Sequence, residues 1–295
     1  MLSGMARIAI IGGGSIGEAL LSGLLRAGRQ VKDLVVAERV PERAKYLADT
    51  YSVLVAPVAD AVDNATFVVV AVKPADVEQV MGEVSRVAAA AESDTAEQVF
   101  VTVAAGVTTS YFESKLPAGA PVVRAMPNAA ALVGAGVTAL AKGRFVTPAQ
   151  LEEVSALFDS VGGVLVVPES QMDAVTALSG SGPAYFLLMV EALVDAGVAA
   201  GLTRQVATDL TAQTMAGAAA MLLERLDSDS EAAAEQAPGM LPDATAVQLR
   251  ATVTSPGGTT AAGLRELERG GLRVAVDAAV QAAKMRSEQL RITSE

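Results

Sequence analysis

The chain has 295 residues, of which 52% are apolar and only 3% aromatic, with a net charge of −11 and neither cysteine nor histidine. These absences exclude disulfides, thiolate nucleophiles, histidine acid–base catalysis and the usual zinc-ligand sets, so we expect no metal site. An acidic chain without a basic cluster and with few aromatics is also a poor nucleic-acid binder. Chemistry must therefore come from hydroxyls, carboxylates, lysines, backbone amides and a cofactor.

No apolar run reaches the ~18 uncharged residues of a spanning helix. The best candidate, residues 186–198, contains Glu191 and Asp195. The N-terminus is not a convincing signal peptide, because its only early cation is Arg7 and glycines interrupt the apolar stretch. We expect a cytoplasmic protein that contacts neither membrane nor nucleic acid.

The first motif is a short apolar run, residues 8–11, followed by Gly12-x-Gly14-x-x-Gly17 and an apolar helical pattern. A strand, a glycine turn and a helix in this order form a dinucleotide fingerprint. Gly12 would make the turn, Gly14 would admit a pyrophosphate and Gly17 would let the helix pack closely on the strand. The free N–H groups at the helix start favour an anion, whereas the alternative is a glycine loop without a ligand. The dinucleotide-binding residues predicted here are Gly12, Gly14, Ser15, Ile16 and Gly17.

Further strand-like runs alternate with helical patterns as far as residue 168, which predicts βαβ units and a doubly wound sheet. The uninterrupted apolar run at 66–72 is typical of a parallel strand buried on both faces. The predicted strands are 33–37, 52–55, 66–72, 99–103, 121–125, 136–141 and 163–167.

Long helical patterns replace this alternation in the last part of the chain. We therefore predict an α/β fold with two domains, a Rossmann-type NAD(P)-binding domain at 1–168 and a helical domain at 169–295. Small residues crowd the helices, which favours burial against another subunit, with a monomeric bundle as the alternative. The acidic segment 227–248 carries no Lys or Arg and is predicted to be a solvated, mobile loop. The predicted helices are 182–200, 204–226, 264–269 and 273–291.

The coenzyme type depends on conflicting signals at the end of the second strand. Glu38 is placed to bind a ribose 2′-OH and select NAD, whereas the adjacent Arg39, with Arg43 a turn further, suits a 2′-phosphate. A surface ion pair of Glu38 and Arg39 is the third alternative. We favour NADP, with NAD as the second choice.

Two more turns, at residues 71–74 and 124–128, follow predicted strands. They lie at the edge of the sheet where ligands bind in open α/β folds. Either turn could simply end its strand. Lys73 is a candidate catalytic acid. The residues predicted to contact the cofactor from this edge are Val72, Lys73, Pro74, Ala104 and Asn128.

A second glycine-rich turn, Ser255-Pro-Gly-Gly-Thr-Thr260, leads into a helix. Backbone N–H groups at a helix start, with two glycines and two threonine hydroxyls, can bind an anion such as a substrate carboxylate. A capped helix without a ligand is an equal alternative. Ser179 precedes another helix and could line a site or serve only the turn.

Together, in this order, these turns resemble pyrroline-5-carboxylate reductase. The segments that carry the resemblance are Ile10 to Gly17, Ala71-Val-Lys-Pro74, Ala104-Ala-Gly-Val107, Arg124-Ala-Met-Pro-Asn128, Ser179-Gly-Ser-Gly-Pro-Ala-Tyr185 and Ser255 to Thr260. The resemblance implies NAD(P)H-dependent reduction of the cyclic imine 1-pyrroline-5-carboxylate to L-proline, the last step of proline biosynthesis. It also implies helical dimerisation, assembly of dimers into a decamer, and a substrate turn facing a partner's nicotinamide.

An imine substrate suits a protein without histidine, because a basic imine can be protonated before hydride arrives. We expect the amides of Gly257 to Thr259 to bind the carboxylate and the Thr260 hydroxyl, as the catalytic group, to hydrogen-bond the imine nitrogen. The predicted substrate-binding residues are Ser179, Ser255, Gly257, Gly258, Thr259 and Thr260. The chain departs from the family where a His-Pro-Gly segment usually precedes this turn: here Ala237-Pro-Gly lacks the histidine.

Two other functions remain open from the sequence. A β-hydroxyacid dehydrogenase also pairs a Rossmann domain with helices, but it needs a catalytic lysine that residues 182–226 do not contain. A non-catalytic NAD(P) sensor or scaffold would keep Gly12 to Gly17 without needing the turn at Ser255.

Overall fold

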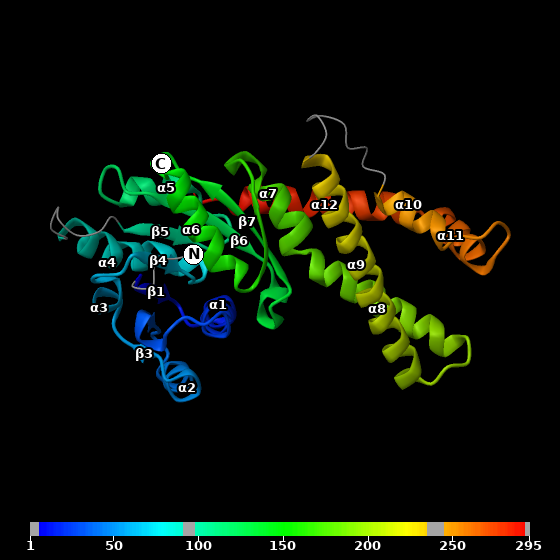
Figure 1. Cartoon of the computed structure of the whole chain (residues 1–295), viewed down its shortest axis with the longest axis horizontal. Helices are drawn as coiled ribbons and strands as arrows, with labels where there is room; N and C mark the ends of the chain where they lie inside the picture. The colour runs from blue at the N-terminus through cyan, green and yellow to red at the C-terminus, as the bar shows by residue number, and fades with distance from the viewer. Residues whose placement is uncertain (1–5, 91–97, 235–244, 293–295) are drawn as a thin grey trace. The chain divides into compact units, whose positions relative to one another are not determined.

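The computed structural model describes residues 6–90, 98–234 and 245–292 and divides into two compact units (Figure 1). The sheet unit comprises Met1–Pro183 together with Val280–Glu295, and the helical unit comprises Ala184–Ala279.

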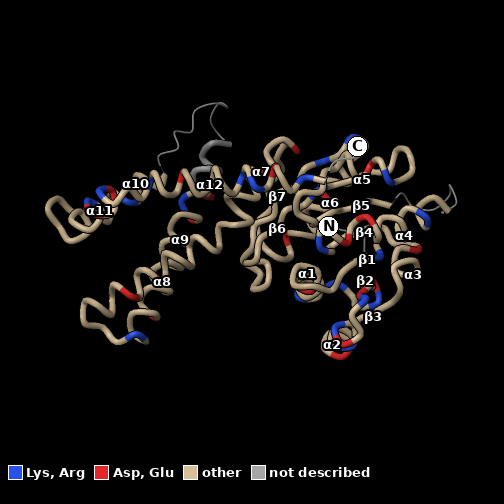
Figure 2. Tube along the Cα trace, turned by 180° about the vertical axis from the view of Figure 1, so that it is seen from behind, with Lys and Arg blue, Asp and Glu red and all other residues tan. Residues whose placement is uncertain are grey.

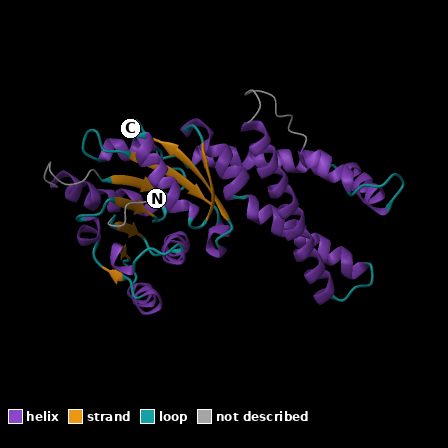
Figure 3. Ribbon diagram, in the orientation of Figure 1, coloured by secondary structure: helices purple, strands orange, loops and turns teal. Residues whose placement is uncertain are grey.

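All strands among the described residues lie in the sheet unit (Figure 3). They form one eight-stranded sheet in the order β3-β2-β1-β4-β5-β6-β7-β8. The first six strands are parallel and have the order 3-2-1-4-5-6, which confirms the predicted doubly wound sheet. Their bounds are β1 Ile8–Ile11, β2 Leu34–Ala37, β3 Leu54–Val55, β4 Phe67–Val70, β5 Val99–Thr102, β6 Val122–Pro127, β7 Gly136–Lys142 and β8 Gly162–Val166.

The last two strands depart from an all-parallel sheet. β7 pairs with β6 in antiparallel fashion, and β8 is parallel to β7. The reason is the short connection at 128–135, which holds only the 3-10 turn Ala129–Val133. A parallel crossover needs a dozen or more residues, so the chain turns back instead.

Helices cover both faces of the sheet, and alternate strand residues point to each face. Ile8 and Ile10 pack with α1, α2 and α6 in one core, whereas Ala9 and Ile11 pack with α3, α4 and α5 in the other. All four strand residues are at most 1% exposed, which is typical of a sheet sandwiched between helix layers. The helices of this unit are α1 Ser15–Arg26, α2 Pro41–Tyr51, α3 Val58–Val62, α4 Val77–Ala90, α5 Thr109–Lys115, α6 Pro148–Asp159 and α7 Met172–Val175.

The helical unit buries very little by itself. Val194 and Ala207 are the only buried apolar side chains among its described residues. Most of the trace of α8 and α9 carries no charged residue (Figure 2). The helical stretch Glu169–Ala199 is long and apolar enough to cross a membrane by length and composition alone. The helices are α8 Gly182–Ala199, α9 Arg204–Ala234, α10 Thr245–Thr252, α11 Thr259–Arg269 and α12 Leu272–Gln289.

The prediction of a loop at residues 227–248 is wrong for much of that segment. Helix α9 continues to Ala234 and α10 begins at Thr245, while residues 235–244 lie outside the described part. The alanines and glutamate at 231–234 are strong helix formers, and their propensity extends α9 beyond the acidic residues that precede them.

The sheet unit extends past residue 168 and also includes the end of α12. The division into these two units therefore differs from the predicted domain boundary. Asp173 on α7 is 1% exposed and accepts hydrogen bonds from Ser287 Oγ at 2.6 Å and Arg291 Nε at 2.7 Å. The backbone N–H of Ile292 donates to the carbonyl of Gly106 at 2.8 Å. These bonds fasten the C-terminal segment to the sheet unit, and no local sequence pattern reveals them.

Candidate cofactor and substrate sites

The first glycine-rich loop joins β1 to α1 in a conformation that two of its glycines make possible. Gly12 has a φ of +108°, and a Cβ there would lie 2.6 Å from the carbonyl oxygen of Ala71. A Cβ on Gly17 would lie 2.0 Å from the carbonyl oxygen of Gly12, so only glycine allows α1 to pack so closely. A Cβ on Gly14 would meet nothing within 4 Å, which leaves the start of α1 open. This geometry agrees with the turn and packing roles predicted for Gly12 and Gly17.

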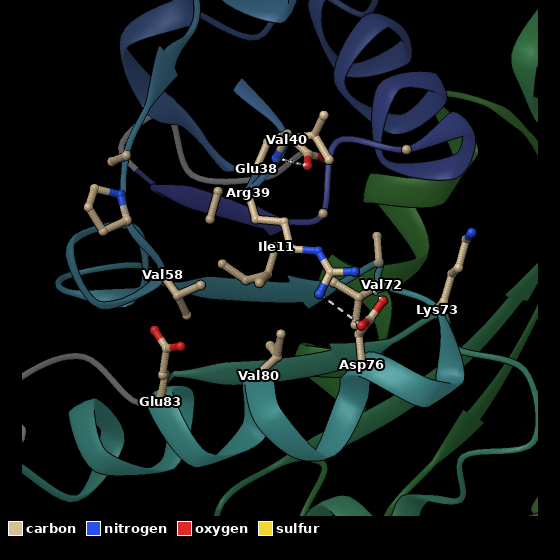
Figure 4. Close-up of a pocket in the computed structure, with 16 residues that line it drawn as sticks. Ile11, Glu38, Arg39, Val40, Val58, Val72, Lys73, Asp76, Val80 and Glu83 are labelled. Carbon is tan, nitrogen blue, oxygen red and sulfur yellow. Dashed lines mark hydrogen bonds and ion pairs between the residues drawn. The ribbon is translucent and has the colours of Figure 1, made fainter. Parts of the chain in front are cut away.

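A cavity of about 450 Å³ lies beside this loop, at the carboxyl ends of β1, β2 and β4 (Figure 4). In an open α/β sheet a dinucleotide binds at this edge, where the strand order reverses. The predicted cofactor residues that line the cavity are Gly12, Gly14, Glu38, Arg39, Val72 and Lys73.

Glu38 accepts a backbone hydrogen bond with each of its carboxylate oxygens, one of them from the glycine loop. Oε2 accepts the backbone N–H of Gly13 at 2.9 Å, and Oε1 accepts that of Val40 at 2.8 Å. Arg39 pairs with Asp76 instead of Glu38, with Nη1 2.9 Å from Oδ1 and Nη2 3.1 Å from Oδ2. The surface ion pair between Glu38 and Arg39, weighed from the sequence, is therefore wrong.

Arg43 supports the loop rather than facing the cavity. Its Nε donates to the carbonyl of Gly13 at 2.7 Å, and its Nη2 pairs with Glu18 on α1. Glu18 also accepts hydrogen bonds from the hydroxyls of Tyr51 at 2.8 Å and Tyr46 at 3.1 Å. The suggestion that Arg43 helps to bind a 2′-phosphate is thus not supported.

These contacts shift two pKa values. Burial raises the pKa of Glu18, but hydrogen bonds from Arg43 and the two tyrosines outweigh burial and lower it below the ordinary value. Burial, followed by the hydrogen bond to the Glu18 carboxylate, raises the pKa of Tyr51 to about 12. Glu18 therefore stays ionised and Tyr51 stays a donor near neutral pH, which keeps the base of the loop fixed.

The remaining predicted cofactor residues do not line this cavity. Ala104 is buried, and its N–H donates to Thr102 Oγ1 at 3.3 Å; Asn128 Oδ1 accepts the N–H of Val137 at 3.3 Å. The side chain of Lys73 extends from the rim, away from Asp76 (Figure 4). A cofactor contact stays a prediction for the residues outside the cavity: Ser15, Ile16, Gly17, Pro74, Ala104 and Asn128.

The second glycine-rich turn lies in the helical unit and is exposed in the single chain. The N–H of Gly258 donates to the carbonyl of Ser255 at 3.0 Å, and Gly257 has a φ of +71°. Proline at the second position and glycine at the third are the residues that a type II turn favours. The Gly258 N–H is thus already donated within the turn, and the substrate contacts expected at Gly257 and Gly258 stay predictions.

Helix α11 begins directly after this turn. Its first backbone bond within the helix runs from Ala262 N to the carbonyl of Gly258, at 3.1 Å. The N–H groups of Thr259 and Thr260 precede that bond and make none within the helix, and the N-cap Gly258 has no side chain to serve them. These two donors, together with the helix dipole, are free to bind an anion.

Ser179 lies in the sheet unit, in the short helical turn Thr176–Gly180. Its Oγ is buried and has no hydrogen-bond partner within the described residues. Leaving a buried hydroxyl unpaired costs about 1–3 kcal/mol. A ligand or a water molecule at this position would remove that cost.

Arg124 is a core residue that the sequence analysis did not identify. It is 2% exposed on β6, and its Nη1 lies 2.7 Å from Glu169 Oε1. A single arginine in an otherwise apolar strand is the signal that could have identified it.

Two family models match the chain. One described as "Pyrroline-5-carboxylate reductase dimerisation" matches residues 169–290, and one described as "NADP oxidoreductase coenzyme F420-dependent" matches residues 7–106.

Individual proteins match along nearly the whole length. The chain is 80% identical to a pyrroline-5-carboxylate reductase of Mycobacterium tuberculosis and 79% identical to one of Mycobacterium leprae, over 295 residues that cover all of both chains. A solved pyrroline-5-carboxylate reductase from Coxiella burnetii matches with a TM-score of 0.85 and 34% identity, over 98% of this chain and 100% of that one. A Plasmodium falciparum pyrroline carboxylate reductase with NADP bound gives a TM-score of 0.76 and 25% identity, over 97% and 98%. The open glycine loop, the cavity beside it and these full-length matches lead to one conclusion: the chain belongs to the pyrroline-5-carboxylate reductase family.

Proposed function

We propose that this protein reduces the cyclic imine 1-pyrroline-5-carboxylate to L-proline with NAD(P)H, completing proline biosynthesis. The observation that carries the proposal is 80% identity along the full length to an enzyme named for that reaction. The glycine loop supplies what a dinucleotide needs, because the start of α1 is open and only glycine fits at Gly12 and Gly17.

We further propose that NADPH is the preferred coenzyme; when bound, it supplies the hydride. Both oxygens of Glu38 already accept backbone hydrogen bonds, from Gly13 and Val40, so the acid that usually selects NAD is already engaged. Arg39 lines the cavity with its side chain 69% exposed, so its guanidinium is accessible to a 2′-phosphate. The NADP in the Plasmodium relative supports this assignment.

We assign substrate binding to the exposed turn at Ser255–Thr260. The N–H groups of Thr259 and Thr260 bind the substrate carboxylate, in place of the Gly258 N–H that closes the turn. The Thr260 hydroxyl holds the imine nitrogen by a hydrogen bond and orients the ring for hydride attack. Since the imine is itself basic, this hydroxyl has to position a proton rather than supply strong acid catalysis.

Thr260→Val tests this assignment, because valine keeps the branched shape and removes only the hydroxyl. We expect kcat for pyrroline-5-carboxylate reduction to fall by about 10- to 100-fold, with Thr260→Ser recovering most of the loss. Steady-state rates of NADPH oxidation measure both.

Thr252→Val is the matched control. Thr252 also lies in the helical unit, but its hydroxyl donates to the carbonyl of Leu249 at 2.7 Å, within α10. Its loss should leave kcat unchanged. Equal rates for wild type and Thr260→Val would remove Thr260 from the mechanism.

The protein forms oligomers through its dimerisation domain. We propose that the exposed apolar side chains of α8 and α9 meet a second copy rather than lipid, that dimers build a decamer, and that the enzyme is cytoplasmic. The turn at Ser255–Thr260 would then face the nicotinamide bound by a partner subunit. Sedimentation of the purified protein without detergent tests the assembly.

A β-hydroxyacid dehydrogenase and a non-catalytic sensor are the functions to exclude. Assays with 3-hydroxy acids and NADP, beside pyrroline-5-carboxylate and NADPH, separate all three. Turnover of a hydroxy acid, or of neither substrate, would contradict the proposal.

A further inference from the structure

We infer that Asp76 tunes the coenzyme preference. It holds Arg39 across the cavity and thereby reduces the preference of the enzyme for NADPH over NADH. This inference rests on the proposed cofactor pocket. It concerns a residue that neither the glycine fingerprint nor the acid rule at Glu38 singles out.

The two side chains come from different strand ends and meet at the cavity. Arg39 follows β2, whereas Asp76 lies in the 3-10 turn Pro74–Asp76 after β4. Two contacts join them, at 2.9 and 3.1 Å, so the guanidinium and the carboxylate face each other edge to edge (Figure 4).

Asp76 is the fixed member of this pair. Its backbone N–H donates to the carbonyl of Lys73 at 2.9 Å, and the next residue, Val77, is fully buried in the core. The Arg39 side chain is 69% exposed, against 25% for Asp76. A ligand can therefore move the Arg39 guanidinium more easily than it can move the Asp76 carboxylate.

The two coenzymes meet this pair differently. A phosphate monoester carries about −1.5 to −2 charges near pH 7, so it must draw Arg39 from Asp76 and tolerate a nearby carboxylate. A ribose hydroxyl has no charge and can donate a hydrogen bond to a carboxylate. Asp76 thus opposes the phosphate but not the hydroxyl.

Asp76→Asn tests the inference in the full-length protein, with pyrroline-5-carboxylate saturating and each coenzyme titrated separately. We expect KM for NADPH to fall about 3- to 10-fold, with KM for NADH unchanged or raised, since exposed charge interactions are modest. The difference should shrink between 50 and 500 mM salt, because ions screen partly exposed charges.

Two controls distinguish the effect of breaking the Arg39–Asp76 pair from the effect of removing any negative charge near the cavity. Glu83 on α4 lines the same cavity but lies apart from Arg39, so Glu83→Gln removes one negative charge without breaking the pair (Figure 4). Its effect on the NADPH to NADH ratio should be clearly smaller. In an Arg39→Gln background, Asp76→Asn should lower KM for NADPH less than it does in the wild type, because only the repulsion between the carboxylate and the phosphate is left to remove.

The inference is wrong if Asp76→Asn changes both coenzymes equally, or if Glu83→Gln matches it. The failure of the proposed reaction is a separate outcome. If neither coenzyme supports turnover, fluorescence titration of NADPH and NADH still gives their affinity ratio in wild type and Asp76→Asn.

Discussion

The two units use apolar residues in opposite ways. In the sheet unit, strand residues such as Phe67 and Val69 are fully buried between helix layers. In the helical unit, Leu188 is 66% exposed and Val274 75% exposed. Burial of apolar surface is favourable, so the sheet unit completes its own core, whereas the helical unit leaves apolar surface for the second copy that we propose. Folding and association are thus divided between the two parts of the chain.

The largest expected effect comes from a substitution that destabilises the sheet unit. Gly17→Val places a Cβ only 2.0 Å from the carbonyl oxygen of Gly12. We expect a loss of about 3 kcal/mol of unfolding free energy and of NADPH binding, because α1 can no longer pack on β1. Thermal unfolding and NADPH fluorescence measure the two effects.

Gly14→Ala is its control, because the added Cβ meets nothing within 4 Å. The stability of this variant should stay near wild type even if coenzyme affinity falls. Normal stability and NADPH binding in Gly17→Val would contradict the close packing of α1 on β1.

The second prediction concerns a substitution in the helical unit that weakens association. Leu188→Glu puts a charge on the apolar surface of α8, where burial of a leucine contributes about 1.5–3 kcal/mol per copy. We expect a smaller oligomer by sedimentation or light scattering. Leu54→Glu is the matched control: Leu54 lies on the edge strand β3 of the sheet unit and is 58% exposed, so the assembly should be unchanged. If instead Leu54→Glu dissociates the protein and Leu188→Glu does not, the interface is in the sheet unit.

The third and smallest effect concerns the bonds that return the C-terminal segment to the sheet unit. Asp173→Asn replaces the carboxylate that faces Arg291 and Ser287 and should cost about 2 kcal/mol of unfolding free energy, moderated by the partial exposure of Arg291. Chemical denaturation at pH 7 measures this loss, which Ser287→Ala should reproduce only in part.

The stability difference between wild type and Asp173→Asn should also depend on pH. Burial raises the pKa of Asp173, but hydrogen bonds from Arg291 and Ser287 outweigh burial and lower it below its ordinary value of 3.8. The stabilisation is therefore complete above the unfolded-state pKa and is lost as pH falls from there through the folded-state pKa. The stability gap between wild type and Asp173→Asn should narrow below pH ~4. A gap that stays constant on acidification would contradict this assignment.

Features that depend on local pattern could be predicted from the sequence. The apolar run at 66–72 predicts β4, and the glycine spacing predicts the loop between β1 and α1. Both follow from rules that act over a few residues, namely burial on two faces and the steric freedom of glycine.

Features that depend on a distant partner could not be predicted. Nothing near Asp173 indicates Arg291, and nothing near Arg39 distinguishes Asp76 from any other carboxylate as its partner. The N–H of Gly258 is donated within its own turn, a detail that only the closed geometry reveals. Tertiary contacts of this kind decide which predicted site residues are free for a ligand.

The return of α12 to the sheet unit also has a consequence for synthesis. The ribosome produces every strand of the sheet before the helical unit, but Ser287, Arg291 and Ile292 emerge only after it. Domains generally fold as they leave the ribosome, so the sheet can form early while Asp173 still lacks its partners. The unit that binds the coenzyme is thus finished only when the helices of the assembly surface are already available to meet another chain.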